Sequence, residues 1–203
     1  MWYYIKQSFL PFVYLFFVAM SGFGVVSIGD HLLALKILLA LLNLAMYLVI
    51  VCGAAYKDGQ TAYKTMLAND LERIQIIKTG EDRPLKLKEE YKWWKGYLYG
   101  FIACVPLLIL LLIHTILILI NPTLNGAGVI AGLMYLAFFL FFRLKTGVGM
   151  GDTAVIAPST FYFSLIALPI IMLASGIPYV LGAKKIKLQQ ERIKAKQREI
   201  YGE

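Results

Sequence analysis

Apolar residues gather into blocks of about 20, the length that a helix needs to cross about 30 Å of hydrocarbon. The blocks occupy residues 7–28, 32–56, 97–120, 127–143 and 161–182. The chain is 60% hydrophobic and 16% charged, whereas soluble domains are about 45–50% apolar and about 25% charged. Nearly all of the charge lies between the blocks. We therefore predict an all-α fold, a polytopic integral membrane helical bundle with four or five transmembrane helices.

The polar stretches divide the chain into four predicted parts. These are an N-terminal transmembrane hairpin (1–56), a cytosolic amphipathic helical insertion (57–96), a C-terminal transmembrane region (97–182) and a basic helical tail (183–203). The N-terminus lacks the short apolar region and small-residue cleavage site of a signal peptide. It is predicted to be an aromatic interfacial anchor that leads into a retained helix.

The insertion at 57–96 contains nine Lys/Arg and seven Asp/Glu. Its apolar residues at helical spacing are Tyr63, Leu67, Leu71, Ile74 and Ile77. This spacing predicts an amphipathic helix that stops near Thr79-Gly80. A second charged helix is expected from about Leu85, through Trp93 and Trp94, into the membrane. The insertion is thus predicted to be a helical hairpin on the membrane surface.

The tail contains seven Lys/Arg and three Asp/Glu. An apolar seam repeats every seven residues at Tyr179, Ile186, Ile193 and Ile200, which predicts that the fifth block continues outward as one helix. The seam is either a coincidence on a solvated helix or a docking edge for a partner or for the surface hairpin. Trp93, Trp94, Lys184 and Lys185 are predicted membrane-surface anchors, because aromatic and basic residues concentrate at the headgroup level.

Charge predicts the topology, since Lys and Arg mark the cytosolic side of membrane proteins. The insertion and the tail are both basic, so both are expected in the cytosol. Three full crossings between residues 97 and 182 would instead put the tail outside. The fourth block is short and glycine-rich. A re-entrant or broken helix there would leave an even number of crossings after the insertion, which would return the tail to the cytosol. The alternative is five full spans with the tail outside.

Few polar residues are candidates for chemistry. His114 lies deep within the third block, where it serves either as a hydrogen-bonding packing residue or as a proton-relay or ligand contact. Arg143, Lys145 and Asp152 flank a Gly-x-Gly-x-Gly stretch at 147–151, which is either a flexible loop or a polar vestibule that binds a ligand or ion. No catalytic set, metal-ligand spacing or cofactor motif is found, so no catalytic residue, metal or cofactor is predicted.

Small residues four positions apart favour close helix packing. Gly96 and Gly100 form one such face on the third block, and Gly128 and Gly132 form another on the fourth. The packing neighbour is either another helix of this chain or another subunit.

These features favour a small, non-enzymatic membrane subunit that assembles with partner proteins as an accessory, scaffold or assembly component of a larger complex. The alternative is a small transporter or channel, acting alone or as a homo-oligomer, with a polar cavity near residues 143–152. A lipid-modifying enzyme is disfavoured because no nucleophile–base pair is present. The +8 formal charge suits anionic lipid headgroups rather than nucleic acid. The expected location is a bacterial inner membrane.

Overall fold

The computed structural model describes residues 9, 13, 33–80, 91–121, 162 and 164–201, and these residues are almost entirely helical, with no strand among them. The helices are α2 (Leu33–Thr79), α3 (Lys95–Ile120) and α6 (Ala167–Tyr201). All three are long and apolar enough to cross a membrane. The all-α prediction is therefore confirmed for this part of the chain. The fourth block, and all but two residues of the first, lie outside the described residues.

Helix α2 joins two predicted elements into one helix of 47 residues. The second apolar block and the amphipathic segment follow each other with no break near residue 57. The predicted stop at Thr79-Gly80 is confirmed, because Gly80 has φ 63° and donates its N–H to the Ile76 carbonyl at 3.0 Å. Glycine adopts this left-handed conformation without the steric cost of a Cβ atom. The first arm of the expected surface hairpin is thus a direct extension of α2.

Helix α3 starts later than expected. Residues 91–94 are not helical, so the predicted charged helix through Trp93 and Trp94 is wrong at this point. A turn precedes the helix, in which the Lys95 N–H donates to the Lys92 carbonyl at 3.0 Å, and the first turn of α3 is closed by the Leu98 N–H, which donates to the Trp94 carbonyl at 3.1 Å. Helix α3 ends at Asn121, which is extended (φ −149°) and precedes a proline, whose ring disfavours helical backbone at the residue before it.

Helix α6 runs for 35 residues and includes the tail as far as Tyr201, as the sequence predicted. It continues through Pro178 without ending there. Pro178 has no N–H, and the Ala174 carbonyl four residues earlier therefore lacks its usual helical donor. The Cys52 thiol of α2 lies 3.4 Å from this carbonyl and donates a hydrogen bond to it. A contact between helices thus takes the place of the missing helical bond.

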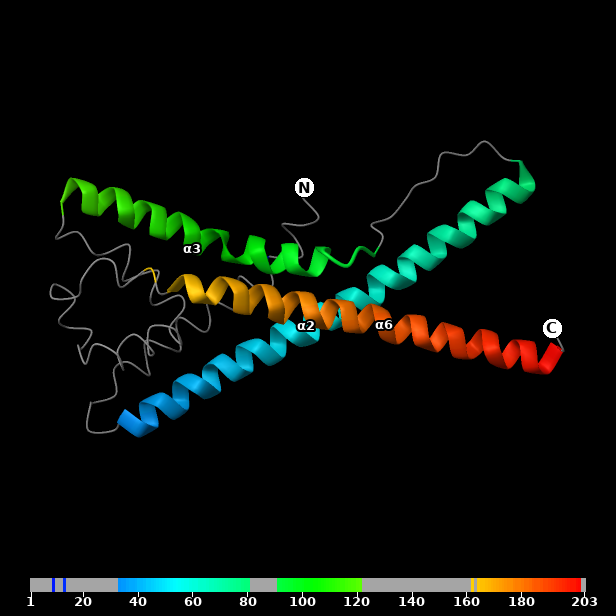
Figure 1. The fold of residues 1–203 in the computed structure, drawn as a ribbon, viewed down its shortest axis with the longest axis horizontal. Helices are drawn as coiled ribbons and strands as arrows, with labels where there is room; N and C mark the ends of the chain where they lie inside the picture. The colour runs from blue at the N-terminus through cyan, green and yellow to red at the C-terminus, as the bar shows by residue number, and fades with distance from the viewer. Residues whose placement is uncertain are drawn as a thin grey trace.

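The three helices form an open bundle (Figure 1). Helix α6 runs parallel to α2, which it crosses, and antiparallel to α3, which lies along its first half. All three helices contribute to the core, through Tyr47, Val51, Cys104, Leu107, Leu111, Ala167 and Ile171. At one end of the bundle, Thr115 Oγ1 of α3 is 2.5 Å from Tyr162 Oη. The described residues on either side of 122–160 therefore lie at the same end.

Beyond the crossing, α2 and α6 diverge at the other end of the bundle (Figure 1). We call residues 63–79 the α2 arm and residues 184–201 the α6 arm. Both arms extend past the N-terminus of α3, and both carry many charged residues. The polar parts of α2 and α6 consequently emerge at one end of the bundle.

Candidate functional site

Glycines form the point at which α2 and α6 cross. A Cβ atom on Gly59 would collide with the backbone of Tyr179, and a Cβ atom on Gly182 would collide with the carbonyl oxygen of Tyr56. In both cases the obstacle is backbone, which cannot rotate away. The two helices therefore approach each other as closely as main-chain contact allows, an arrangement that only small residues permit.

The predicted glycine face of α3 packs within the chain. A Cβ atom on Gly96 would lie 2.6 Å from the Cβ atom of Tyr179, and one on Gly100 would lie 2.7 Å from the Cα atom of Met172. Both neighbours belong to α6. The described structure thus assigns this face to an intramolecular contact, whereas Gly128 and Gly132 lie outside the described residues.

Four tyrosines surround the crossing and connect the three helices with the segment that precedes α3. Tyr179 is only 1% exposed. Its ring stacks on Tyr91, with centroids 5.5 Å apart and planes 17° apart, and meets Tyr99 edge-on at 5.9 Å. Tyr91 in turn meets Tyr63 of α2 edge-on at 5.8 Å. Each such pair contributes about 0.5–1.5 kcal/mol beyond the burial of its area. The cluster therefore fixes the non-helical segment before α3 against both other helices.

A groove of about 570 Å³ opens between the arms, directly beside this tyrosine cluster. We call it the arm groove, and it is lined by Tyr63, Met66, Tyr91, Val180, Ala183, Lys184, Lys187, Leu188 and Glu191. Aromatic and aliphatic side chains make most of its wall, and two lysines and one glutamate supply the charge. The pKa of Tyr91 is raised, first because burial disfavours the phenolate and then because Tyr63 and Tyr97 lie nearby. The Tyr91 phenol is accordingly neutral at physiological pH.

The apolar seams are covered near the crossing and uncovered along the arms. On α6, Ile186 is 9% exposed, whereas Ile193 and Ile200 are 57% and 75% exposed. On the α2 arm, Leu71 and Ile77 are 68% and 80% exposed. The sevenfold repeat predicted for the tail thus lies on one helix, but within the described residues its outer half has no cover.

His114 is fully buried near the other end of the bundle. Its ring centroid lies 5.9 Å from that of Tyr162, and the adjacent Thr115 hydroxyl is 2.8 Å from the Leu111 carbonyl as well as close to Tyr162. Ser164 is also buried there. The structure therefore places His114 in a small polar set within an apolar core. Its predicted companions Arg143, Lys145 and Asp152 lie outside the described residues.

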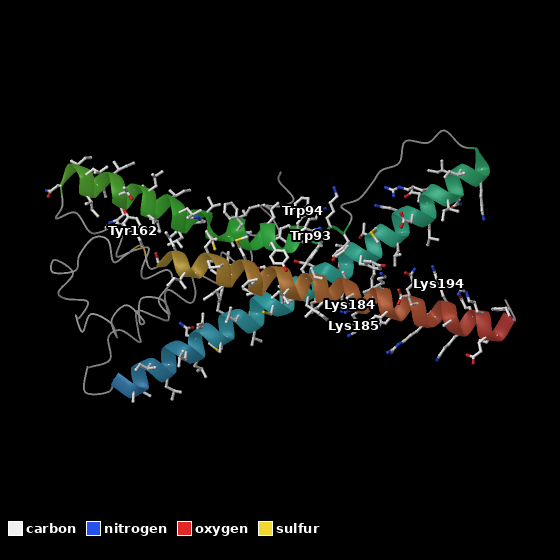
Figure 2. The ribbon with its side chains drawn as sticks, in the orientation of Figure 1. Trp93, Trp94, Tyr162, Lys184, Lys185 and Lys194 are labelled. Atoms are coloured by element: carbon white, nitrogen blue, oxygen red, sulfur yellow. The ribbon has the colours of Figure 1, made fainter. Side chains whose placement is uncertain are left out.

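The predicted surface anchors lie around the crossing (Figure 2). Trp93 is largely exposed and meets Tyr97 edge-on at 6.2 Å. The Lys92 ammonium lies 6.0 Å from the ring centroid of Trp94. Lys184 and Lys185 are both exposed on α6. These side chains form a belt of aromatic and basic groups around the crossing, where the α6 arm begins.

Sequence reasoning missed the paired roles of Gly59 and Gly182, and also the burial of Lys95, which is 4% exposed at the start of α3. A usable signal was present for Gly59, because Ala55 and Gly59 are four residues apart on one face of α2. No comparable signal marks Lys95, since its burial depends on the packing of separate helices. Among the described residues, no group of three His, Cys, Asp or Glu side chains is placed to hold a metal ion.

Within the part of the chain that the structure describes, the geometry defines a helical protein with three helices long and apolar enough to cross a membrane and with two charged arms. Comparison with protein-family models, curated proteins and solved structures finds no match to the chain.

Proposed function

We propose that this protein is a small, non-enzymatic integral membrane subunit, which assembles with a partner protein through its two arms. The observation that carries the proposal is the uncovered apolar seam on each arm. The α6 arm contains seven Lys/Arg and two Asp/Glu within 18 residues, so it belongs in water rather than in hydrocarbon. Rows of large apolar side chains that are exposed to water mark interaction surfaces.

The direction of the helices supports a common cytosolic location for the two arms. Because α2 and α6 are parallel and α3 is antiparallel to both, the arms emerge at one end of the bundle (Figure 1). Thr115 and Tyr162 are in contact at the opposite end, which supports an even number of crossings between the insertion and the tail. This arrangement favours an irregular fourth block over the alternative of five full spans. Basic arms on one side also agree with the charge rule for cytosolic loops.

Reporter fusions test this topology. We expect fusions after Gly80 and after Glu203 to report the cytosol in the same cells, because both positions follow the basic arms. Alkaline carbonate should leave the full chain in the membrane pellet. Opposite locations for the two reporters would contradict the topology, and release of the chain by carbonate would contradict membrane insertion itself.

Changes to the exposed apolar seam of the α2 arm, which consists of Leu71, Ile74 and Ile77, test the assembly proposal. We expect Ile74→Asn combined with Ile77→Asn to lower co-purification of the partner in mild detergent by more than about tenfold. Full burial of one such side chain is worth about 1.5–3 kcal/mol, and about 1.4 kcal/mol corresponds to a factor of ten. The measurement is quantitative mass spectrometry of proteins captured with the tagged full chain.

The matched control is Gln75→Ala combined with Lys78→Ala, which alters the same helical turns but leaves the seam intact. It should retain the partner at close to the wild-type level. Capture of only this protein by the wild-type chain would contradict the proposal, as would equal losses in the two double variants.

A second candidate function is a small transporter or channel. The observation that favours it is the polar set of His114, Thr115, Tyr162 and Ser164 inside an otherwise apolar bundle, because buried polar groups at membrane depth often mark ion or substrate paths. This function requires water to reach His114, which is fully buried in the described structure. The subunit proposal needs no such opening.

A further inference from the structure

We propose that the arm groove is a binding site for one acidic phospholipid, with the headgroup at Lys184 and Lys187 and the acyl chains along the apolar wall. The groove combines both kinds of surface that such a lipid requires. Its aliphatic wall begins with Val180 and Ala183, which lie on the bundle side of Lys184, and continues to Met66 and Leu188. Its basic edge is formed by the two lysines. Glu191 also lines the groove and reduces the positive charge, which leaves a net charge of +1 from these three groups.

The position of the groove supports a lipid rather than a soluble ligand. Tyr91 forms part of its wall and is only two residues from Trp93, so the groove lies at the level of the aromatic belt. Tryptophan and tyrosine occupy the headgroup region of a bilayer. Anionic lipids of the cytosolic leaflet attract each nearby Lys or Arg. The lysines therefore face the region in which acidic headgroups are found.

The floor of the groove is preformed rather than adaptable. Tyr91 is stacked on the buried Tyr179, and Tyr63 is held edge-on against Tyr91. The backbone contact at Gly182 fixes the α6 side next to Ala183. A rigid wall lowers the ordering cost of binding, so it favours one specific lipid over diffuse attraction to a charged helix.

The test is lipid retention by the full chain. The protein is purified from nanodiscs made of phosphatidylcholine with a minority of phosphatidylglycerol, and native mass spectrometry measures which lipid stays bound. We expect one phosphatidylglycerol per chain, in preference to phosphatidylcholine. Lys184→Gln combined with Lys187→Gln should lower this preference by at least about tenfold, because each lysine adds to the attraction.

Lys194→Gln combined with Lys196→Gln is the matched control. It removes the same charge from the same helix, and Lys194 lies farther out along α6 (Figure 2). This control should retain most of the preference. A further variant, Met66→Trp, keeps every charge but fills the apolar part of the groove, and it should also reduce lipid retention. Far-UV circular dichroism of all variants verifies that they remain helical.

Several outcomes would overturn the proposal. One is equal retention of the two lipids by the wild-type chain, and another is an equal loss in the two lysine pairs, which would indicate diffuse attraction to the arm. Displacement of the bound lipid by inorganic phosphate alone would indicate a simple anion site. The proposal rests on membrane insertion, but the two fail differently. A chain that does not insert is released by carbonate, whereas an inserted chain without lipid preference contradicts the groove site alone.

Discussion

Replacement of Gly182 by alanine is expected to lower the free energy of unfolding by about 1–3 kcal/mol, the usual cost of overpacking. The added Cβ atom would meet the Tyr56 carbonyl oxygen of α2, so the two helices must move apart. Gly59→Ala should have a similar effect, because its Cβ atom would meet the Tyr179 backbone. SDS titration of the purified chain in mild detergent, followed by far-UV circular dichroism, measures the change.

Gly53→Ala is the control for this prediction. Gly53 also lies in α2, but a Cβ atom there would have no neighbour within 4 Å. Alanine is intrinsically better than glycine in a helix by up to about 1 kcal/mol, so this variant should be neutral or slightly more stable. If all three variants behaved alike, the close contact at the crossing would be contradicted.

Replacement of Tyr179 by alanine is expected to be the most damaging single truncation near the groove, at about 3–5 kcal/mol. The Tyr179 side chain is almost completely buried and contacts aromatic rings from two other segments. Its loss leaves a cavity where α2, α3 and the segment at Tyr91 meet. The near-UV circular dichroism signal should fall together with stability, because the stacked pair with Tyr91 is lost.

Two further variants are controls for this prediction. One removes only the hydroxyl group of Tyr179, and the other removes an exposed tyrosine from the same helix. Tyr179→Phe keeps the ring and its contacts with Tyr91 and Tyr99, so it should cost much less stability than Tyr179→Ala. Tyr201→Ala removes a tyrosine that is 77% exposed on the same helix, and it should change stability by less than about 0.5 kcal/mol. Equal effects of Tyr179→Ala and Tyr201→Ala would rule out the proposed role of the cluster.

Local patterns were sufficient for the helical elements. Apolar blocks of membrane-spanning length predicted α3 and the first half of α6, and the sevenfold repeat from Tyr179 to Ile200 predicted that α6 continues into the tail. Gly80 marked a helix end through its own backbone preference. Such features depend on residues close together in the chain, so periodicity and stop signals are enough to find them. There are two exceptions. Residues 91–94 are not helical, and α6 continues through Pro178, where a contact from Cys52 satisfies the carbonyl that proline leaves free.

The sites were decided by contacts between residues far apart in sequence. Gly59, Gly96 and Gly182 were each visible as small residues, but only the packed helices show which backbone each of them touches. The arm groove likewise needs α2, α6 and Tyr91 together, and no single segment contains it. Apolar periodicity indicates that a helix has a face to bury, but it does not specify which other segment packs against that face. The blocks of about 20 residues therefore determined the helical, lipid-compatible character of the chain, whereas tertiary packing decided where its crossing, its groove and its uncovered seams lie.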